Sequence, residues 1–598
     1  AIAGLGSALK VAQTNGDTAS QVRWLTLFGH GYVEMKRPLE ALDFYDRALK
    51  AAATVPELQF PTMTYVGRAN ALIALGKIED ADALLTLAGE RAAKYEARGY
   101  QAQLLAQRAA IAEQQKDLPR ALTHYAEALA LARASGGTRL VAEIALAYAK
   151  ALRDSQQVPQ AEALLVEATG LARDMEERWL LPKLLAATAD VHASRGEHAE
   201  ADALLQEATE LLEGLLTTTS SPWAQSRVIS GMDDVLTARI RLEARRSPNP
   251  ARAFAVLEQA RARSLLELLV NRPVAPTPSA DQRTTERRIS SLQRQLLRTR
   301  DARTRRALLT DIFAAEETLA PTAALLLKRP EHAGPRPTVS LADLQRVLRS
   351  DEVLLQYALA DPSSLLLLIT RTTARVVTLP GRTAIVVDVE ALLKAIDADG
   401  SMAQTSRRLG QTLLAPAHEL AGARRVLVSP DGDLHRVPFD LLTRGTRPLL
   451  DTHIVSYVPS ASVLAVLRRQ PTREPSSARA LAVSMTGDAG APLPAGVRRP
   501  SLPRNVYGLD GAKLPPLPGA YDEARAVVNA FGEARSTLLA GATATEATLK
   551  RTPLADYQVL HFAAHGLPST KFPARAALLI QPDAAEDGRD RLGVGDVG

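Results

Sequence analysis

The sequence predicts a two-part protein: an N-terminal α-solenoid of stacked helix pairs, then an α/β domain with a mostly parallel sheet. Small residues recur every 40 positions over about the first 215 residues. From Thr338 onward, short apolar strands alternate with helical stretches instead. Alanine is abundant and aromatic residues make up only 4% of the chain, a composition that suits closely packed helices better than a β-sandwich.

Length and composition place the chain among ordinary folded proteins. Its 598 residues, 46% hydrophobic and 23% charged, are enough for several domains. No stretch approaches the roughly 18 consecutive apolar residues of a membrane span. The N-terminus, Ala1 to Gly4, lacks the pattern of a signal peptide. We therefore expect a cytoplasmic protein that makes no contact with a membrane.

The absence of cysteine limits the chemistry of these residues. It excludes disulfides, thiolate zinc sites and a thiol nucleophile within them. No P-loop, dinucleotide fingerprint or metal-ligand spacing is present either, so we expect no cofactor. The net charge of +6 is a mild bias over 598 residues and gives little reason to expect nucleic acid as a partner.

The repeat shows as columns of small residues in register, with large apolar residues between them. Recurring small residues indicate that helices approach closely at the same point in every unit, and the units must stack to bury their faces. The two small columns are Ala41, Ala81, Ala121, Ala161, Ala201 and Ala48, Ala88, Ala128, Ala168, Ala208, and the large column is Tyr45, Leu85, Tyr125, Leu165, Leu205.

This order of small and large positions resembles the tetratricopeptide (TPR) repeat, whose usual period is about 34. Five units fit, and a sixth, Trp223 to Val270, is offset by an insertion around Thr217 to Pro222. We predict an array of about six helix pairs over residues 1–270. The resemblance implies a groove for a partner protein or peptide, the alternative being a solenoid without a ligand.

A helical basic linker is predicted over residues 271–337. Its segment Arg283 to Arg306 is rich in arginine and carries leucines at helical spacing. One interpretation is a helix that binds nucleic acid or an anionic membrane, and the other is a solvated helical hairpin packed through its leucines. The lack of aromatic side chains to stack on bases favours the second.

The second half contains the candidate chemistry. Predicted strands include 353–359, 364–370, 375–379, 425–429, 480–484 and 559–563, with a further one at 576–580. In parallel sheets, functional residues gather at the carboxyl ends of strands. His565 and Gly566 follow the strand 559–563, which makes them the first candidates.

Six ordered segments then resemble the CHAT domain, a caspase-like module associated with TPR arrays. Two are the most specific: Pro430 to Phe439 follows the family's P-D-G-x-L-H-x-x-P-F segment, and Tyr457 to Ser460 follows its Y-x-P-S segment. The others are Glu258–Leu269, Leu517–Glu523, Gly541–Thr545 and His561–Gly566. The resemblance places a CHAT domain at residues 338–598 and, with the array, covers nearly the whole chain.

The resemblance implies a cysteine endopeptidase of the caspase–separase type. His565 would be its acid–base residue and the Gly566 N–H one oxyanion donor. The stretch Asp590 to Gly598 resembles the segment before the family's cysteine-bearing strand. We therefore expect the domain to be truncated before its nucleophile, and this chain alone to be inactive.

Other candidates carry weaker expectations. Asp522 and Glu523 are placed as substrate-binding carboxylates that favour Arg or Lys, against the alternative of a solvated first helical turn. His561 is assigned to the core and His435 to folding, and no third ligand suggests a metal site with His561 and His565.

Two alternative functions stay open at this point. One is an inactive CHAT scaffold that works through protein interactions. The other is a protease subunit of a bacterial defence complex, for which the basic linker is the local support.

Overall fold

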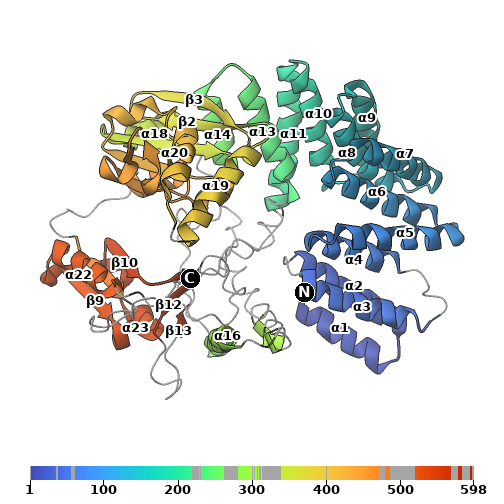
Figure 1. Ribbon diagram of the computed structural model, residues 1–598, viewed down its shortest axis with the longest axis horizontal. Helices are drawn as coiled ribbons and strands as arrows, with labels where there is room; N and C mark the ends of the chain where they lie inside the picture. Colours follow the sequence, from blue (N-terminus) through green and yellow to red (C-terminus); the bar gives the residue numbers. More distant parts are fainter. Residues whose placement is uncertain are drawn as a thin grey trace.

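The computed structural model describes most of the array and the greater part of the α/β half (Figure 1). The described residues are 2–34, 38–55, 61–217, 228, 231–261, 280–299, 301, 304–305, 307–308, 311–312, 315, 339–398, 400–469, 478–484, 517, 519–567, 577–581 and 593–595. The predicted insertion around residues 217–222 and most of the linker lie outside them.

The N-terminal half is a succession of antiparallel helices. They are α1 (Ile2–Thr14), α2 (Thr18–Glu34), α3 (Pro38–Ala52), α4 (Thr62–Ala74), α5 (Ile78–Lys94), α6 (Arg98–Gln114), α7 (Leu118–Ala134), α8 (Thr138–Asp154), α9 (Val158–Asp174), α10 (Leu181–Ser194), α11 (His198–Thr217), α13 (Asp233–Arg245) and α14 (Pro250–Ala260). The helical array predicted from the repeat is confirmed.

The two alanine columns lie on α3, α5, α7, α9 and α11, and every alanine in them is 0% exposed. The large residues between them, from Tyr45 to Leu205, are at most 2% exposed. A zero-exposure alanine leaves no room for a larger side chain without moving the neighbouring helix. The columns therefore fix how closely successive helices pack.

A turn that recurs every 20 residues explains why the period is 40. Each helix from α5 to α9 has 17 residues, and three-residue turns join α5 through α9. The middle turn residue has positive φ, as in Gly76, Glu96, Lys116, Gly136 and Gln156. The next residue donates its N–H to a carbonyl five positions back, for example Asp117 to Ala112, which is the Schellman arrangement at helix ends.

The first α/β unit is built on a five-stranded sheet in the order β3-β2-β1-β4-β7. Its strands are β1 (Glu352–Ala358), β2 (Ser363–Ile369), β3 (Ala374–Pro380), β4 (Arg425–Ser429) and β7 (Ile454–Tyr457). β1, β4 and β7 pair in parallel, whereas β1, β2 and β3 form an antiparallel meander. Its main helices are α18 (Leu341–Val347), α19 (Arg382–Asp397), α20 (Ala403–Leu413) and α21 (Ala461–Arg469).

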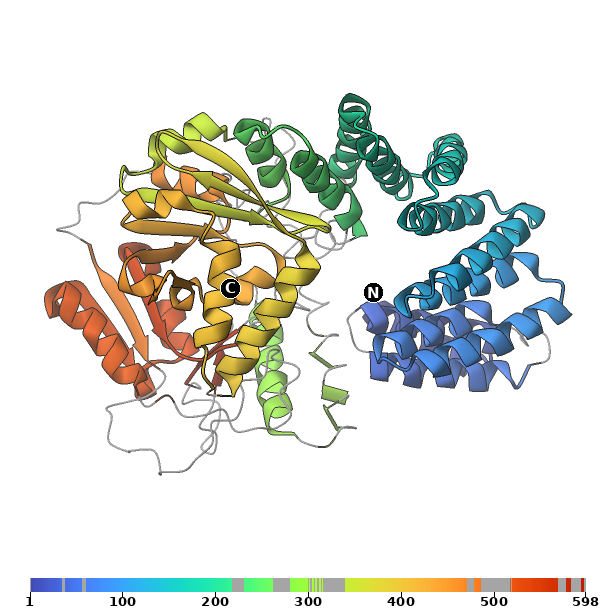
Figure 2. The ribbon, with the colours of Figure 1, turned by 45° about the horizontal axis from the view of Figure 1, so that its top comes forward.

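Helices cover both faces of this sheet, and one of them belongs to the array. Alternate β1 residues such as Val353 and Leu355 pack with α19 and α20. The opposite face, including Leu354, packs with α18, α21 and with Phe254 and Leu257 of α14. Figure 2 shows α13 and α14 lying beside the sheet. The last array helix is thus part of a layer of the α/β unit.

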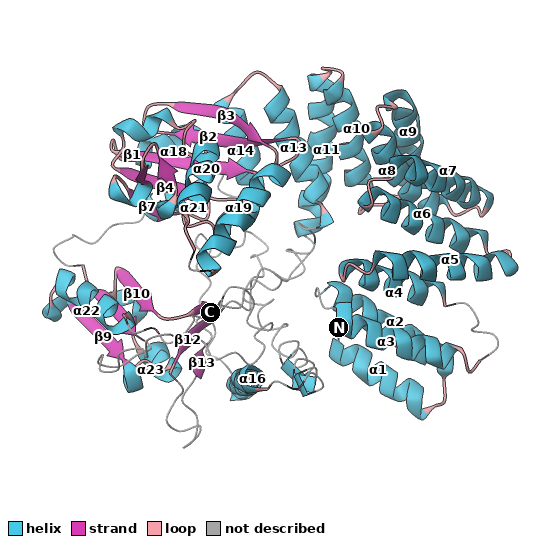
Figure 3. Cartoon of the chain, in the orientation of Figure 1, coloured by secondary structure: helices cyan, strands magenta, loops and turns pink. Residues whose placement is uncertain are grey.

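The second α/β unit holds a separate parallel sheet in the order β10-β8-β9 (Figure 3). It consists of β8 (Ala480–Ser484), β9 (Ser536–Ala540) and β10 (Val559–Ala563), with α22 (Ala520–Phe531) and α23 (Glu546–Arg551). A small antiparallel sheet follows, made of β11 (Gly566–Leu567), β12 (Ala577–Ile580) and β13 (Gly593–Gly595). The predicted α/β class is confirmed, with its parallel strands divided between two sheets.

The basic helix is found as α16 (Ala280–Arg298). Arg283, Arg287 and Arg288 are exposed, while Leu296 is buried in an apolar cluster against which Leu292 packs. A solvated basic face over a packed leucine stripe is the pattern that the second interpretation of this segment predicts.

Two charged side chains at the end of α14 join the array to the first sheet. The Glu258 carboxylate accepts hydrogen bonds from the backbone N–H groups of Ala461 (3.2 Å) and Ser462 (2.7 Å), and from the Gln356 side chain. A carboxylate at the first turn of α21 also compensates the positive end of that helix. Glu258 therefore acts as a helix cap supplied from another domain.

Arg261 makes the matching contact with the carboxyl ends of the strands. Its guanidinium donates to the backbone oxygen of Tyr357 in β1, and to the backbone oxygen (3.3 Å) and Oγ (3.0 Å) of Ser429 in β4. Burial lowers the pKa of Arg261, which the neighbouring carboxylates of Asp431 and Glu258 oppose. Removal of this side chain would leave buried acceptors without a donor.

The turn residues give a first prediction. Lys116→Gly should stabilise the array by roughly 1 kcal/mol, because glycine adopts positive φ without the steric cost that other residues incur. Gly136→Lys, the reciprocal change in the next turn, should destabilise it by a similar amount. Urea unfolding followed by circular dichroism measures both, and changes of the same sign would contradict the strain explanation.

The junction gives a second prediction. Arg261→Ala should lower the stability of the array–sheet contact by roughly 3 kcal/mol, as expected when one partner of a buried polar network is removed. Arg371→Ala, in the exposed turn after β2, is the matched control and should change stability by less than about 0.5 kcal/mol. Equal urea midpoints for the two variants would show that the junction contributes nothing.

Candidate active site

His565 lies where the sequence pattern places it. β10 ends at Ala563, which is in register with Ser484 of β8, and Ser484 with Ala540 of β9. All three strands are parallel, so the two residues after Ala563 leave the carboxyl edge of the sheet. This is the edge at which open α/β sheets carry their binding and catalytic groups.

The imidazole of His565 is buried, whereas the residue after it is exposed. The His565 residue is 3% exposed, and Gly566, the first residue of β11, lies on the surface. A Cβ built on Gly566 would meet no described atom within 4 Å. The Gly566 backbone is therefore accessible on its Cα side, whereas the neighbouring His565 is buried.

Ala564 lies between β10 and His565 and connects this end of the sheet with α16, the helix of the linker. It packs against the apolar cluster that includes Leu296 of α16 and Ile312. α16 also contacts β13 of the small antiparallel sheet. The cover over the His565 corner thus includes a helix that lies outside both α/β units in the sequence.

Of the two predicted substrate carboxylates, Glu523 faces β10. Its Oε1 lies 3.0 Å from Nε2 of His561, a close approach that does not have the geometry of a hydrogen bond. Asp522 is exposed in the same first turn of α22. Whether either binds substrate stays a prediction.

Two family-like segments, Pro430–Phe439 and Tyr457–Ser460, assemble in the first α/β unit, whereas Gly541–Thr545 follows β9 in the second. Tyr457 of the Y-x-P-S segment accepts a hydrogen bond from the Phe439 N–H (2.8 Å), and Phe439 is fully buried. Ser460 caps α21 by accepting from the Val463 N–H (3.1 Å). The Asp431 carboxylate accepts from the Leu359 N–H (2.7 Å). These residues hold loops in place, which is a structural role.

His435 belongs to this second group. It lies in the short turn Gly432–Arg436 with an exposed surface, and partial desolvation lowers its pKa, with Asp431 opposing and Arg261 reinforcing the effect. Its assignment to folding stays a prediction. The sequence did not predict the contact of Arg261 with Ser429 and Tyr357. No motif at these two acceptors points to an arginine partner.

The described residues show neither a metal centre nor a membrane span. No three His, Asp or Glu side chains among them gather as metal ligands would. No helix in the described part of the chain is long and apolar enough to cross a bilayer.

Residues 403–592 match the family model of the CHAT domain. This match includes α20, the strands from β4 to β12, and both His565 and Gly566. No curated protein matches the sequence.

Several solved structures are similar to parts of this chain at low identity. BtubC from P. vanneervenii is 19% identical with a TM-score of 0.31, covering 35% of this chain and 89% of its own. A STAND protein with a tetratricopeptide repeat sensor from Pyrococcus horikoshii is 13% identical with a TM-score of 0.31, covering 42% and 37%. Aspartyl phosphate phosphatase F from Bacillus subtilis is 12% identical with a TM-score of 0.32, covering 55% and 77%.

The family match and the repeat geometry agree on the architecture. The small-residue columns are buried between paired helices of the N-terminal half, and the matched domain follows them. The chain therefore has a TPR–CHAT architecture, a TPR-like helical array followed by a CHAT domain with a caspase-like, peptidase-related fold.

Proposed function

We propose that this chain is the histidine-bearing part of a TPR-regulated cysteine endopeptidase, of the caspase–separase type, that cleaves a protein partner once activated. The observation that carries the proposal is the position of His565 and Gly566. They follow the carboxyl end of a parallel strand inside a CHAT domain.

The chemistry assigns a role to each of these two residues. His565 takes the proton from a cysteine thiol, and the thiolate attacks the carbonyl carbon of the scissile peptide bond. The Gly566 N–H stabilises the negative charge that develops on the carbonyl oxygen. His565 then gives its proton to the leaving amine, and water hydrolyses the thioester that remains. The thiol is supplied by a residue outside these 598.

The burial of His565 supports regulation of the enzyme. The His565 residue is 3% exposed, and a general acid–base must contact both the thiol and the leaving group. The corner must open, and the packing of Ala564 against the Leu296 cluster is one contact that opening would change. A protease that is covered until a signal arrives fits a domain joined to a protein-binding array.

The carboxylates of α22 suggest the specificity. Asp522 and Glu523 carry negative charge in the helix packed over β10, so we assign them to binding Arg or Lys before the scissile bond. Both carboxylates are exposed, and Glu523 lies near His561, whereas no contact of Asp522 is described.

The proposal predicts a loss of cleavage on His565→Ala. In a protein that contains these residues and the cysteine, activated by its partner, the rate should fall by about 10² to 10⁴, the usual contribution of a general acid–base. The measurement is mass spectrometry of peptides released from a lysate of the cells that make the protein. Iodoacetamide should abolish the same cleavages, since the nucleophile is a thiol.

The matched control is His418→Ala, a histidine exposed in a short turn of the first α/β unit. It should leave cleavage unchanged. The isolated 598-residue chain should release no peptides. Cleavage that survives His565→Ala would overturn the assignment of His565, and a protein with no cleavage under any condition would favour the inactive scaffold.

A further inference from the structure

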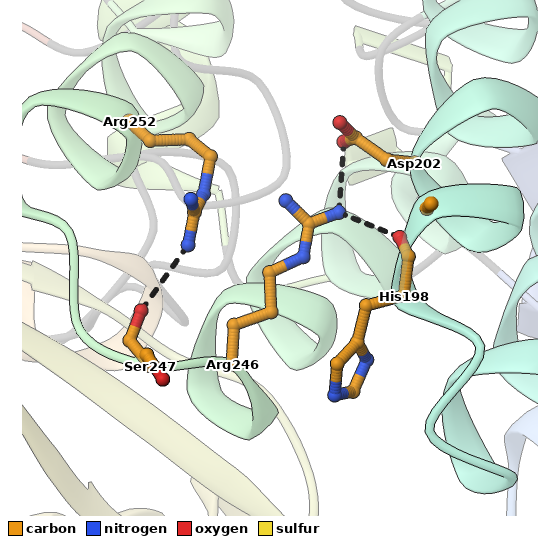
Figure 4. A pocket seen from close by; sticks show the side chains of 6 residues that line it. His198, Asp202, Arg246, Ser247 and Arg252 are labelled. Carbon is orange, nitrogen blue, oxygen red and sulfur yellow. Dashed lines mark hydrogen bonds and ion pairs between the residues drawn. The ribbon is translucent and has the colours of Figure 1, made fainter.

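A polar pocket lies at the end of the array, between the first turn of α11 and the turn that joins α13 to α14 (Figure 4). It has a volume of about 350 Å³ and is lined by His198, Ala199, Asp202, Arg246, Ser247 and Arg252. This volume is at the lower end of the range for ligand pockets. Its lining contains no phenylalanine, tyrosine or tryptophan, and alanine is its one apolar residue.

Charged groups of the pocket form a network with an excess of positive charge. Arg246 lies 3.1 Å from Asp202 and 3.4 Å from Glu243, and Arg252 lies 2.7 Å from Glu243. Arg239 approaches Asp202 to 3.6 Å. Three guanidinium groups thus face two carboxylates, and the Glu243 side chain is only 3% exposed. The network retains one positive charge that no carboxylate within it neutralises.

Two hydrogen-bonding atoms of the pocket residues lack a partner among the described residues. They are Nε of Arg246, whose side chain is 10% exposed, and Nδ1 of His198. A buried polar atom without a partner costs roughly 1–3 kcal/mol. His198 also begins the 20-residue helix α11, whose first N–H groups add positive potential to this corner. The positive potential of this corner favours a ligand with negative charge.

The balance of charge selects the kind of anion. One uncompensated positive charge matches a carboxylate, whereas a phosphate dianion would place a second negative charge near Asp202. The Asp202 side chain is 44% exposed and can accept an N–H from the same ligand. An acidic residue in a peptide supplies both the carboxylate and the neighbouring backbone N–H.

We propose that this pocket binds an acidic side chain of the protein partner of the array, a step that rests on the partner binding of the proposed function. The pocket is connected to the α/β half through a single helix. Arg252 and Glu258 belong to the same helix, α14, and Glu258 with Arg261 holds that helix to the first sheet. A partner bound here contacts the helix that enters the CHAT-bearing half of the chain.

The test compares two alanine-to-glutamate variants in the whole 598-residue chain. Ala199→Glu places a tethered carboxylate in the pocket lining, where it competes with the ligand without removing any arginine. Ala126→Glu adds the same charge at an exposed position of α7 and is the matched control. The probes are fluorescein-labelled tetraglutamate and tetraglutamine, measured by fluorescence anisotropy at low ionic strength, where exposed charges are least screened.

Tetraglutamate should bind the wild type more tightly than tetraglutamine. Ala199→Glu should weaken the binding of tetraglutamate by at least about tenfold, because like charges in a pocket repel. Arg252→Gln should weaken it as well, and Ala126→Glu should not.

Three outcomes would overturn the assignment. They are equal weakening by the two glutamate variants, equal binding of the two peptides, and stronger competition by inorganic phosphate than by acetate. No cleavage is measured, so a failed binding test leaves the peptidase proposal intact, and an inactive His565 leaves this site intact.

Discussion

The clamp made by Glu258 and Arg261 is the contact on which the arrangement of the two halves depends. Both groups are charged, and both form hydrogen bonds with backbone atoms of the first α/β unit. Glu258 accepts from N–H groups in the first turn of α21, and Arg261 donates to carbonyl oxygens at the ends of β1 and β4. Neither unit completes these hydrogen bonds alone among the described residues. A helical array joined only by apolar packing could slide on the sheet, whereas directional bonds to helix and strand ends fix its position.

The array itself is a repeat of helix and turn with a period of 20. Seventeen residues of helix and three of turn recur, and two such modules give the 40-residue unit. The buried columns could be predicted from the sequence, because a position with room only for alanine carries an alanine in every repeat. The turn geometry could not, because Glu96, Lys116 and Gln156 occupy positive φ without the glycine that usually marks it. The hydrogen bonds that close each turn, such as Asp117 N–H to the Ala112 carbonyl, are made whether or not the middle residue is glycine.

The candidate site shows the same division between local and non-local information. The strand before His565 and the small residue after it are local patterns, and they were sufficient to place both residues at the carboxyl edge of a sheet. The division of the parallel strands into two sheets is a matter of pairing between distant segments, which the alternation of strands and helices leaves open. The approach of Glu523 to His561, and of Arg261 to Ser429, joins residues far apart in sequence for the same reason.

Among the described residues, α13 and α14 contact the first α/β unit, and the first helices of the array share an apolar cluster against which the residue before His565 packs. The clamp of α14 reaches the first α/β unit, whose own motif residues serve its loops. The apolar cluster of Leu9 and Val22, in the first two helices, also includes Leu296 of α16, and Ala564 packs against it. The last helix of the array is thus held by directional hydrogen bonds, whereas its first two helices share with Ala564 an apolar cluster whose contacts are not directional. The two ends of the array are joined to the α/β half by interactions of different kinds.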